Sequence, residues 1–198
     1  MKRVFGKCRS YLLKTIAMCV GYIFYNRRYL KGNEFDKKTY SSGWKFVMHD
    51  VFYQKIIGIQ RNIPFPVAPW CQVVGWENIE FDLNTVGIFQ RPGCYFQASG
   101  AKIKIGEGTY LAGGIGIITA NHNIYNLKEH LPGKDVVIGK NCWIGMNSVI
   151  LPGVVLGDHT VVGAGSIVTK PFEDGYCVIA GNPAKVIRTL DKEKFNEG

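Results

Sequence analysis

The sequence predicts a mainly β protein folded as a parallel β-helix, in which short strands wind around a narrow core. The first observation is a lattice of aliphatic residues spaced six apart: Ile138, Ile144, Ile150, Leu156, Val162 and Val168. The second is a turn signal three positions after five of them: Asn141, Asn147, Gly153, His159 and Gly165. Gly, Asn and His tolerate a positive φ, so each of these units contains a corner. A six-residue period is typical of stacked hexapeptides and excludes an amphipathic helix.

The remaining lattice positions fit the same interpretation. One residue after the aliphatic position, glycine recurs at Gly139, Gly145, Gly157 and Gly163. Four residues after it stand compact side chains: Cys142, Ser148, Val154, Thr160 and Ser166. Compact residues suit a narrow interior, so we expect Cys142 to be a core thiol.

The lattice begins earlier in the chain and is interrupted once. Ile105, Leu111 and Ile117 are again six apart, but 21 residues separate Ile117 from Ile138, three more than a multiple of six. Extra chain must therefore leave the coil and return. We place this projecting loop at residues 123–136.

These limits divide the chain into three regions. Residues 1–70 form a basic, aromatic N-terminal arm with a short helix and an irregular region. Residues 71–190 form the β-helix, whose first turns are irregular, and residues 191–198 form a tail. Because a bare last coil would leave an exposed sheet edge, we expect residues 176–190 to cap it.

The positive charge is concentrated at the N-terminus. The chain carries a formal net charge of +9, yet residues 1–31 contain eight Lys or Arg and no Asp or Glu. The rest of the chain is nearly neutral, with 16 basic and 15 acidic residues. A neutral main domain lacks the basic surface of nucleic-acid binders, so we expect no nucleic-acid partner.

The basic arm also contains an apolar run rich in aromatic residues, Thr15 to Tyr25. These eleven residues are too few for a spanning helix, which needs about 20, and no signal-peptide cleavage site follows. Basic flanks suit a helix lying on an anionic membrane surface. Packing on the β-helix or on a neighbouring subunit explains the run equally well, and both interpretations stay open.

The six cysteines show neither a C-x-x-C motif nor metal-ligand spacing. Such a pattern predicts reduced, mostly buried thiols and no bound metal. Reduced thiols are typical of cytoplasmic proteins. We therefore expect a cytoplasmic location, on the inner face of the membrane if the arm binds lipid.

The lattice separates the four histidines. His159 occupies a corner, which explains it structurally, and His49 lies in the N-terminal region with no partner in view. His130 lies within the projecting loop, where we expect it to be solvated. His122 ends a coil just before the loop, so its imidazole should be exposed beside a flap. His122 is therefore the candidate catalytic residue.

Three stretches resemble the hexapeptide-repeat acyltransferases: IGKNCWIGMNSVILPGV from Ile138, VGAGSIVTK from Val162 and AGNPAKVIR from Ala180. Within that superfamily, the chain is most similar to the galactoside, maltose and nodulation-factor O-acetyltransferases and to the capsule or O-antigen O-acetyltransferases. The resemblance covers residues 100–190, about half of the chain. It does not extend to the first 70 residues, so it does not identify the substrate.

The resemblance implies a left-handed β-helix that assembles as a homotrimer and binds acetyl-CoA as cosubstrate in clefts between subunits. His122 matches the family's catalytic histidine. The positions that line the CoA groove in the family correspond to Trp143, Gly145, Ala164, Thr169, Lys170, Lys185 and Arg188. Lysine and arginine suit a ligand that carries a pyrophosphate and a 3′-phosphate.

The chain departs from the family at one point near the acceptor. Sugar-accepting members often carry an Asn in an Asn-aromatic-Asn setting, whereas residues 92–97 read PGCYFQ here. Gln97 or Asn84 could take that role, and the sequence does not choose between them. Aromatic residues between positions 44 and 96 could stack on sugars, but we expect most of them to serve packing.

The resemblance and the place of His122 predict an O-acetyltransferase that acts on a saccharide hydroxyl, in the synthesis of a surface polysaccharide such as capsule or O-antigen. A neutral imidazole, whose pKa is ordinarily about 6.5, can accept the hydroxyl proton as the oxygen attacks the thioester. The backbone N–H of Gly145 or Met146 is a candidate donor to the oxyanion. The acetyl group would pass directly, without a covalent enzyme intermediate.

Other interpretations remain beside this one. An amino-sugar N-acetyltransferase would receive a deprotonated amine and need less of a base. A carbonic-anhydrase-like zinc hydratase needs three converging histidines, and His122 and His130 lack a convincing third. A serine acetyltransferase would carry a longer helical N-terminal domain. A noncatalytic β-helix scaffold would leave His122, Lys170 and Arg188 unexplained.

Overall fold

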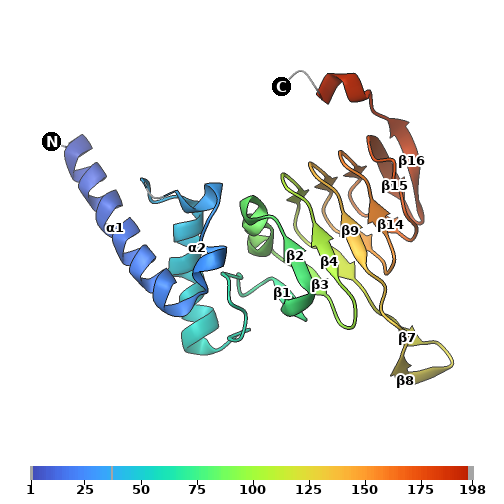
Figure 1. Cartoon of the computed structure of the whole chain (residues 1–198), viewed down its shortest axis with the longest axis horizontal. Helices are drawn as coiled ribbons and strands as arrows, with labels where there is room; N and C mark the ends of the chain where they lie inside the picture. Colours follow the sequence, from blue (N-terminus) through green and yellow to red (C-terminus); the bar gives the residue numbers. More distant parts are fainter. Residues whose placement is uncertain (1, 37, 196–198) are drawn as a thin grey trace.

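The computed structural model describes residues 2–36 and 38–195 of the chain. A helical N-terminal unit stands at one end of a stack of short strands, and a two-stranded ribbon projects from the side of the stack (Figure 1). Strands of successive coils lie side by side, as the hexapeptide lattice predicts.

The N-terminal unit is mostly helical up to Ile57, and residues 58–71 follow without helix or strand. It consists of α1 (Lys2–Phe24), the 3-10 helices η1 (Arg27–Tyr29) and η2 (Asn33–Phe35), α2 (Ser42–Val51) and the π-helical segment η3 (Phe52–Ile57). Ala17 and Gly21 on the inner side of α1, and Tyr25 just after its end, are buried. A Cβ on Gly21 would lie 3.4 Å from Trp44 of α2. The predicted apolar run therefore belongs to a longer helix that packs along one side.

A chain of aromatic rings joins this unit to the first coils. The ring centroids of Tyr29 and Phe65 are 5.1 Å apart, those of Phe65 and Phe89 4.7 Å, and those of Phe89 and Phe96 5.0 Å. Phe89 and Phe96 are at most 1% exposed, which confirms the expected packing role for these two rings. Trp70, at 49% exposure, is an exception.

A buried carboxyl also links α2 to the first coil. Asp50 is fully buried; its Oδ1 hydrogen-bonds His49 Nδ1 at 2.8 Å, and its Oδ2 accepts from Gln90 Nε2 at 2.7 Å. Burial raises the pKa of the Asp50 carboxyl, and the two hydrogen bonds partly offset that rise. The partner of His49, not evident in the sequence, is thus the adjacent residue of its own helix.

Three sheets form the sides of the coil, and the chain visits them in turn. The first contains β1 (Gln72–Val74), β3 (Tyr95–Gln97), β6 (Gly116–Ile118), β11 (Val149–Ile150) and β14 (Ile167–Val168). The second contains β2 (Ile79–Phe81), β4 (Ile103–Ile105), β9 (Val136–Ile138) and β12 (Val155–Leu156). The third contains β5 (Tyr110–Leu111), β10 (Trp143–Ile144), β13 (Val161–Val162), β15 (Cys177–Gly181) and β16 (Ala184–Thr189).

Neighbouring strands within the three sheets are parallel, except that β15 and β16 are antiparallel. The first turns are irregular, as predicted, because they contain the 3-10 helices η4 (Trp76–Asn78) and η5 (Leu83–Gln90). η5 lies where a further strand of the third sheet would precede β5. The irregular register upstream of Ile103 therefore has a structural cause.

The interior is lined by the predicted lattice. Its members are at most 4% exposed: Ile105, Leu111, Ile117, Ile138, Ile144, Ile150, Leu156, Val162 and Val168. Cys142 is buried as expected, and burial raises the pKa of its thiol to about 11. The buried Thr160 Oγ1 donates to Gly157 O at 2.7 Å, so this interior hydroxyl is satisfied.

The residues at the predicted corners have a left-handed backbone conformation, with φ between 53° and 83°: Asn141, Asn147, Gly153, His159 and Gly165. The His159 ring lies against Tyr176 and Phe195, with centroids 4.7 and 4.4 Å away. The structural explanation of His159 is therefore confirmed.

The C-terminal segment closes the stack. β16 pairs with β15 beyond the last coil, which confirms a cap there. The predicted tail instead contains a short 3-10 helix, η6 (Lys192–Phe195). The contacts of Phe195 with His159 and Tyr176 explain why this part is ordered; the last residues of the predicted tail, 196–198, lie outside the described chain.

Close stacking of the coils leaves no room for a side chain at Gly139. A Cβ there would lie 2.7 Å from the backbone nitrogen of Asp158 and 2.8 Å from the carbonyl carbon of Gly157. We therefore expect Gly139→Ala to lower the free energy of unfolding by about 1–3 kcal/mol, as measured by urea denaturation.

Gly116→Ala is the matched control, because the nearest atoms, on Val149, would lie 3.6 and 3.7 Å from the new Cβ. This variant should be as stable as the wild type or slightly more stable. Equal stability of the two alanine variants would contradict the stacking argument.

Candidate active site

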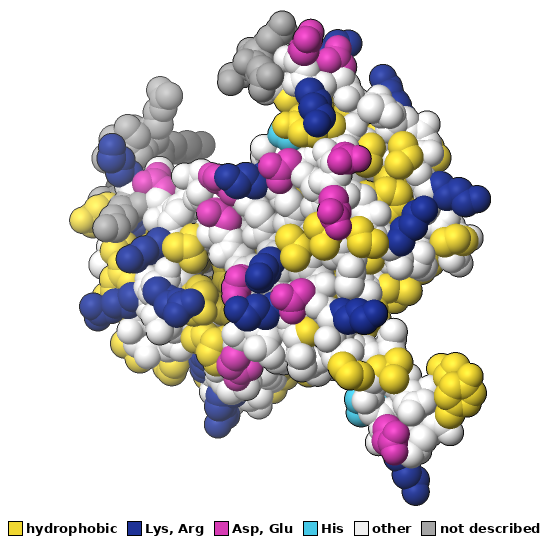
Figure 2. All heavy atoms as spheres, turned by 45° about the vertical axis from the view of Figure 1, so that its right-hand side comes forward, with side chains coloured by type: hydrophobic (Ala, Val, Ile, Leu, Met, Phe, Trp, Pro, Cys, Tyr) yellow, Lys and Arg dark blue, Asp and Glu magenta, His cyan; other side chains and the backbone are white. Residues whose placement is uncertain are grey.

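The candidate catalytic histidine lies at the base of the projecting ribbon. Beyond β6, residues 119–121 turn at the corner between the first and second sheets. The chain then forms β7 (His122–Asn123), which pairs antiparallel with β8 (Asn126–His130). The ribbon stands clear of the stack in Figures 1 and 2. The loop expected from the broken register is therefore a β-ribbon.

Gln97 supports the corner from which the ribbon departs. Its Oε1 accepts from the backbone N–H groups of Thr119 at 3.1 Å and Ala120 at 3.3 Å, and Thr119 Oγ1 donates to Gln97 O at 3.0 Å. The base of the ribbon is closed by Leu131 N–H, which donates to Asn121 O at 2.8 Å. Of the two acceptor-site candidates, Gln97 is thus the one next to the turn that carries His122.

The imidazole of His122 is exposed and held in one orientation by the ribbon backbone. Its Nδ1 lies 2.9 Å from the carbonyl oxygen of Leu127. A carbonyl only accepts hydrogen bonds, so Nδ1 carries the proton and the neutral ring leaves Nε2 as an acceptor. The arrangement gives an exposed nitrogen base of defined direction.

A second histidine faces the first across the ribbon. His130 pairs with His122 in the strand register, and the ring centroids are 4.2 Å apart at an interplanar angle of 38°. His130 is exposed, as expected, but it also contacts the candidate base. Among the described residues, no group of three or more His, Cys, Asp or Glu is arranged to hold a metal ion.

Asn84 lies at a different corner of the coil, between the second and third sheets. Its Oδ1 accepts from the backbone N–H of Asn33 at 2.9 Å, and its Nδ2 donates to Glu107 Oε1 at 3.4 Å. These bonds tie η2 to the first coils. The structure therefore does not bring Asn84 together with His122.

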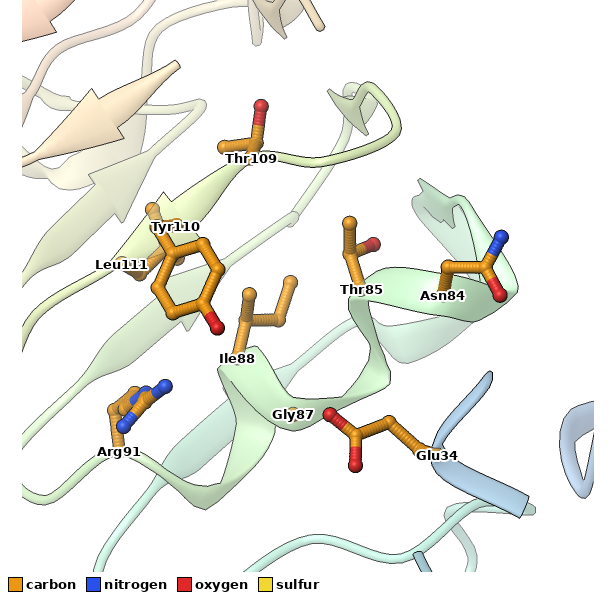
Figure 3. Close-up of a pocket in the computed structure, with 9 residues that line it drawn as sticks. All are labelled: Glu34, Asn84, Thr85, Gly87, Ile88, Arg91, Thr109, Tyr110 and Leu111. Atoms are coloured by element: carbon orange, nitrogen blue, oxygen red, sulfur yellow. The ribbon is translucent and has the colours of Figure 1, made fainter. Parts of the chain in front are cut away.

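Asn84 also lines a pocket between the helical unit and the third sheet (Figure 3). Glu34 and Arg91 border it from opposite sides, and the Arg91 guanidinium carbon lies 5.7 Å from the centre of the Tyr110 ring. Arg91 Nε is buried without a hydrogen-bond partner in the described chain. Sequence reasoning missed this pocket because its residues come from separate elements.

The outer surface of the third sheet carries an apolar row that ends in a cation. The row follows the register of adjacent strands: Tyr110 pairs with Trp143, Trp143 pairs with Val161, Val161 pairs with Val178, and Val178 pairs with Arg188. Tyr110 and Trp143 are 64% and 58% exposed. Of the predicted groove residues, Trp143 and Arg188 thus share one row, and Lys185 lies nearby on the same strand as Arg188.

Two other predicted groove positions follow strands of the third sheet. Ala164 is exposed. A Cβ on Gly145 would lie 2.6 Å from Ala164 N and 2.7 Å from Val162 O. The Gly145 N–H donates to Val162 O at 2.8 Å. Gly145 is therefore required for coil stacking, and its N–H is not the oxyanion donor that the sequence suggested.

Thr169 and Lys170 are exposed after β14, at the corner between the first and second sheets. Residues 119–121 occupy the same corner two coils earlier. His122, Gln97, Thr169 and Lys170 thus gather along one edge of the three-sided coil. In a triangular section this edge is opposite the third sheet, so one copy of the chain does not unite the two groups.

Comparison with known proteins agrees with this architecture. The family model of the bacterial transferase hexapeptide (six repeats) matches residues 135–170, the coils from β9 to β14. A Staphylococcus aureus (strain Mu50) protein provisionally named an acetyltransferase is 32% identical over 156 residues, covering 77% of this chain and 73% of the relative. A Saccharomyces cerevisiae protein with the same provisional name is 41% identical over 98 residues, 48% of this chain and 49% of its own.

Solved structures of acetyltransferases are also similar to this chain. A galactoside acetyltransferase in complex with coenzyme A is 26% identical, with a TM-score of 0.47; the match covers 64% of this chain and 65% of that chain, just under two thirds of its length. A maltose O-acetyltransferase from Clostridium difficile 630 is 25% identical, with a TM-score of 0.48 and coverage of 91% and 89%. With a relative at 32% identity over most of both chains, this chain belongs to the hexapeptide-repeat acetyltransferases.

Proposed function

We propose that the protein transfers acetyl from acetyl-CoA to a hydroxyl group of a saccharide, with His122 as the general base. The observation that carries this proposal is the hydrogen bond from His122 Nδ1 to Leu127 O, which directs the Nε2 lone pair away from the ribbon backbone. The sequence resemblance supports a surface polysaccharide, such as capsule or O-antigen, as the acceptor. We place the reaction in the cytoplasm.

Acetyl transfer needs an acceptor for the hydroxyl proton and a thioester carbonyl for the hydroxyl oxygen to attack. Nε2 accepts the hydroxyl proton as the acceptor oxygen bonds to the thioester carbonyl carbon, and the tetrahedral intermediate then expels the CoA thiolate. The imidazolium returns its proton to the thiolate sulfur, so the enzyme ends in its starting state. General-base help is worth about 10²- to 10⁴-fold, and holding both reactants together supplies a further large part.

The side chains on the third sheet support acetyl-CoA as the cosubstrate. The exposed rings of Tyr110 and Trp143 offer apolar surface to the pantetheine arm, and Arg188 and Lys185 offer cations to its phosphates. Lys170, across the coil, is a further cationic candidate. We assign Trp143, Ala164, Thr169, Lys170, Lys185 and Arg188 to the cosubstrate groove, with Gly145 as a stacking glycine beside it.

A homotrimer of left-handed β-helices would bring the two groups together. The edge with His122 and the third sheet lie on different sides of the coil, so a closed ring of three copies could place the edge of one beside the sheet of the next. The ribbon tip supports this arrangement, because Ile124, Tyr125 and Leu127 are 77%, 93% and 71% exposed. Apolar side chains on a projecting ribbon are stabilised when a neighbouring copy covers them.

His122→Ala should lower acceptor-dependent thiol release from acetyl-CoA by at least about 10²-fold, because the base is lost. The measurement is thiol release over a panel of sugars and amino sugars, with the KM for acetyl-CoA unchanged. His159→Asn is the matched control, since Asn tolerates the left-handed φ of 56° at that corner. Full activity of His122→Ala would refute the assignment, and release only with amino sugars would indicate N-acetyl transfer.

Gln97→Leu should lower kcat more than it raises KM, because the Ala120 N–H loses its side-chain acceptor, the Thr119 N–H keeps only the carbonyl oxygen of residue 97, and the turn before His122 loses support. Gln97→Glu keeps an acceptor at the same place and should retain most of the activity. Steady-state kinetics of both variants tests this positioning role. Equal losses in the two variants would contradict it.

Arg188→Gln should raise the KM for acetyl-CoA about tenfold, the effect of losing one charge-assisted hydrogen bond. The KM for acetyl-pantetheine, which has no pyrophosphate or 3′-phosphate, should stay at the wild-type value. Lys192→Gln removes another exposed cation near the C-terminus and serves as the control. A parallel rise for both donors would place Arg188 outside the phosphate site.

A further inference from the structure

The outer side of α1 is apolar although it faces solvent. Leu12, Ile16, Cys19 and Ile23 are spaced four, three and four residues apart, which places them on one side of the helix. Leu12, Ile16 and Ile23 are 60%, 43% and 74% exposed, and Cys19 is also exposed. We call these four residues the outer stripe.

The outer stripe is separate from the packed side of α1. Ala17 and Gly21 on the inner side, and Tyr25 just after the end of the helix, are buried against α2 and its surroundings. In Figure 1, α2 lies between α1 and the strands, so α1 is the outermost element at this end of the molecule. The outer stripe is therefore not needed for the contact with α2, and it faces away from the β-helix.

The segment of the chain that contains the stripe has basic residues and no acidic ones. Residues 1–31 contain eight Lys or Arg and no Asp or Glu. Arg9 is exposed and lies seven residues before Ile16, on the same line of the helix. Arg27 and Arg28 are exposed just after the helix ends. Figure 2 shows Lys and Arg side chains among apolar ones on the side of the molecule that carries the N-terminal unit.

We propose that the outer stripe docks α1 onto the surface of an anionic lipid bilayer. The helix lies parallel to the surface, its apolar residues enter the boundary of the acyl region, and its cations contact the headgroups. No helix in the described part of the chain is long and apolar enough to cross a membrane. The proposal concerns attachment at the surface and does not depend on the reaction.

Charge complementarity selects the bilayer over a second copy of the chain. Pairing two α1 helices through their stripes would bring together two segments that each carry eight basic and no acidic residues. Like charges at close range oppose the pairing of two such helices, whereas anionic headgroups attract the basic helix. The apolar and charged features of α1 thus match one partner.

The test is flotation of the full chain with lipid vesicles. We expect binding to vesicles of about three parts phosphatidylcholine to one part phosphatidylglycerol, and at least about tenfold weaker binding to phosphatidylcholine alone. Raising the salt concentration from about 0.1 M to about 0.5 M should weaken the binding, because the attraction between cations and headgroups is screened.

The double variant Ile16→Ser with Ile23→Ser should bind the anionic vesicles at least about tenfold more weakly, since two apolar side chains leave the interface. Its thermal midpoint should match that of the wild type, because both residues face outward. Val186→Ser with Ile187→Ser is the control: these residues are 51% and 65% exposed on β16, at the opposite end of the molecule. The control should bind like the wild type.

Cys19 provides a second readout on the stripe itself. It is the exposed member among the described cysteines; Cys71, Cys94, Cys142 and Cys177 are buried. In a Cys8→Ser background, an environment-sensitive fluorophore on Cys19 should shift to shorter wavelength with anionic vesicles. The same dye on Asp191→Cys, in a background that also carries Cys19→Ser, should not shift.

Three results would overturn the proposal. The first is the absence of flotation with anionic vesicles at low salt. The second is flotation that the stripe variant leaves unchanged. The third is a molecular mass by light scattering that falls by half in the stripe variant, which would make the stripe an interface between copies.

Discussion

The fold depends on the backbone hydrogen bonds that hold each coil against the next. Gly139 N–H donates to Leu156 O, Gly145 N–H to Val162 O and Gly163 N–H to Ile179 O, each at 2.8 Å. At this spacing, an added Cβ at the first two glycines would meet backbone atoms of the following coil. The same stacking aligns equivalent residues of successive coils into rows. A groove along such a row needs no special loop, because the repeat itself places the side chains.

The site divides into parts that the coil positions in different ways. The third sheet offers its apolar row and Arg188 through strand register alone. His122 instead stands on a ribbon outside the repeat, where its ring is oriented by a backbone carbonyl and contacted by His130. The ribbon in turn rests on a corner held by Gln97. The repeat thus carries the candidate base on a ribbon that interrupts it.

The N-terminal unit covers the open end of the first coil. The first coil has no preceding coil to pack against, and the aromatic chain through Phe65 and Phe89 fills that end. The Asp50 hydrogen bonds to His49 and Gln90 add a polar link at the same junction. Once α1 has packed on α2, its other side remains apolar and exposed. The apolar residues of the arm therefore divide between two sides: those on the inner side pack into the core, and those on the outer side stay exposed.

The sequence by itself determined the repeat, the left-handed corners, the buried lattice and the place of His122. It did so because the same residue types recur at the same positions of each hexapeptide and impose the same local geometry. It did not show that Gln97 rather than Asn84 lies next to the turn before His122, that the His130 ring contacts the His122 ring, or that Gly145 serves stacking. Nor did it show that residues 192–195 pack as a 3-10 helix. Each of these features depends on contacts between residues that are distant in the chain or that lie on different coils. Only tertiary structure decides them, because such contacts depend on how coils close and stack, which no local pattern records.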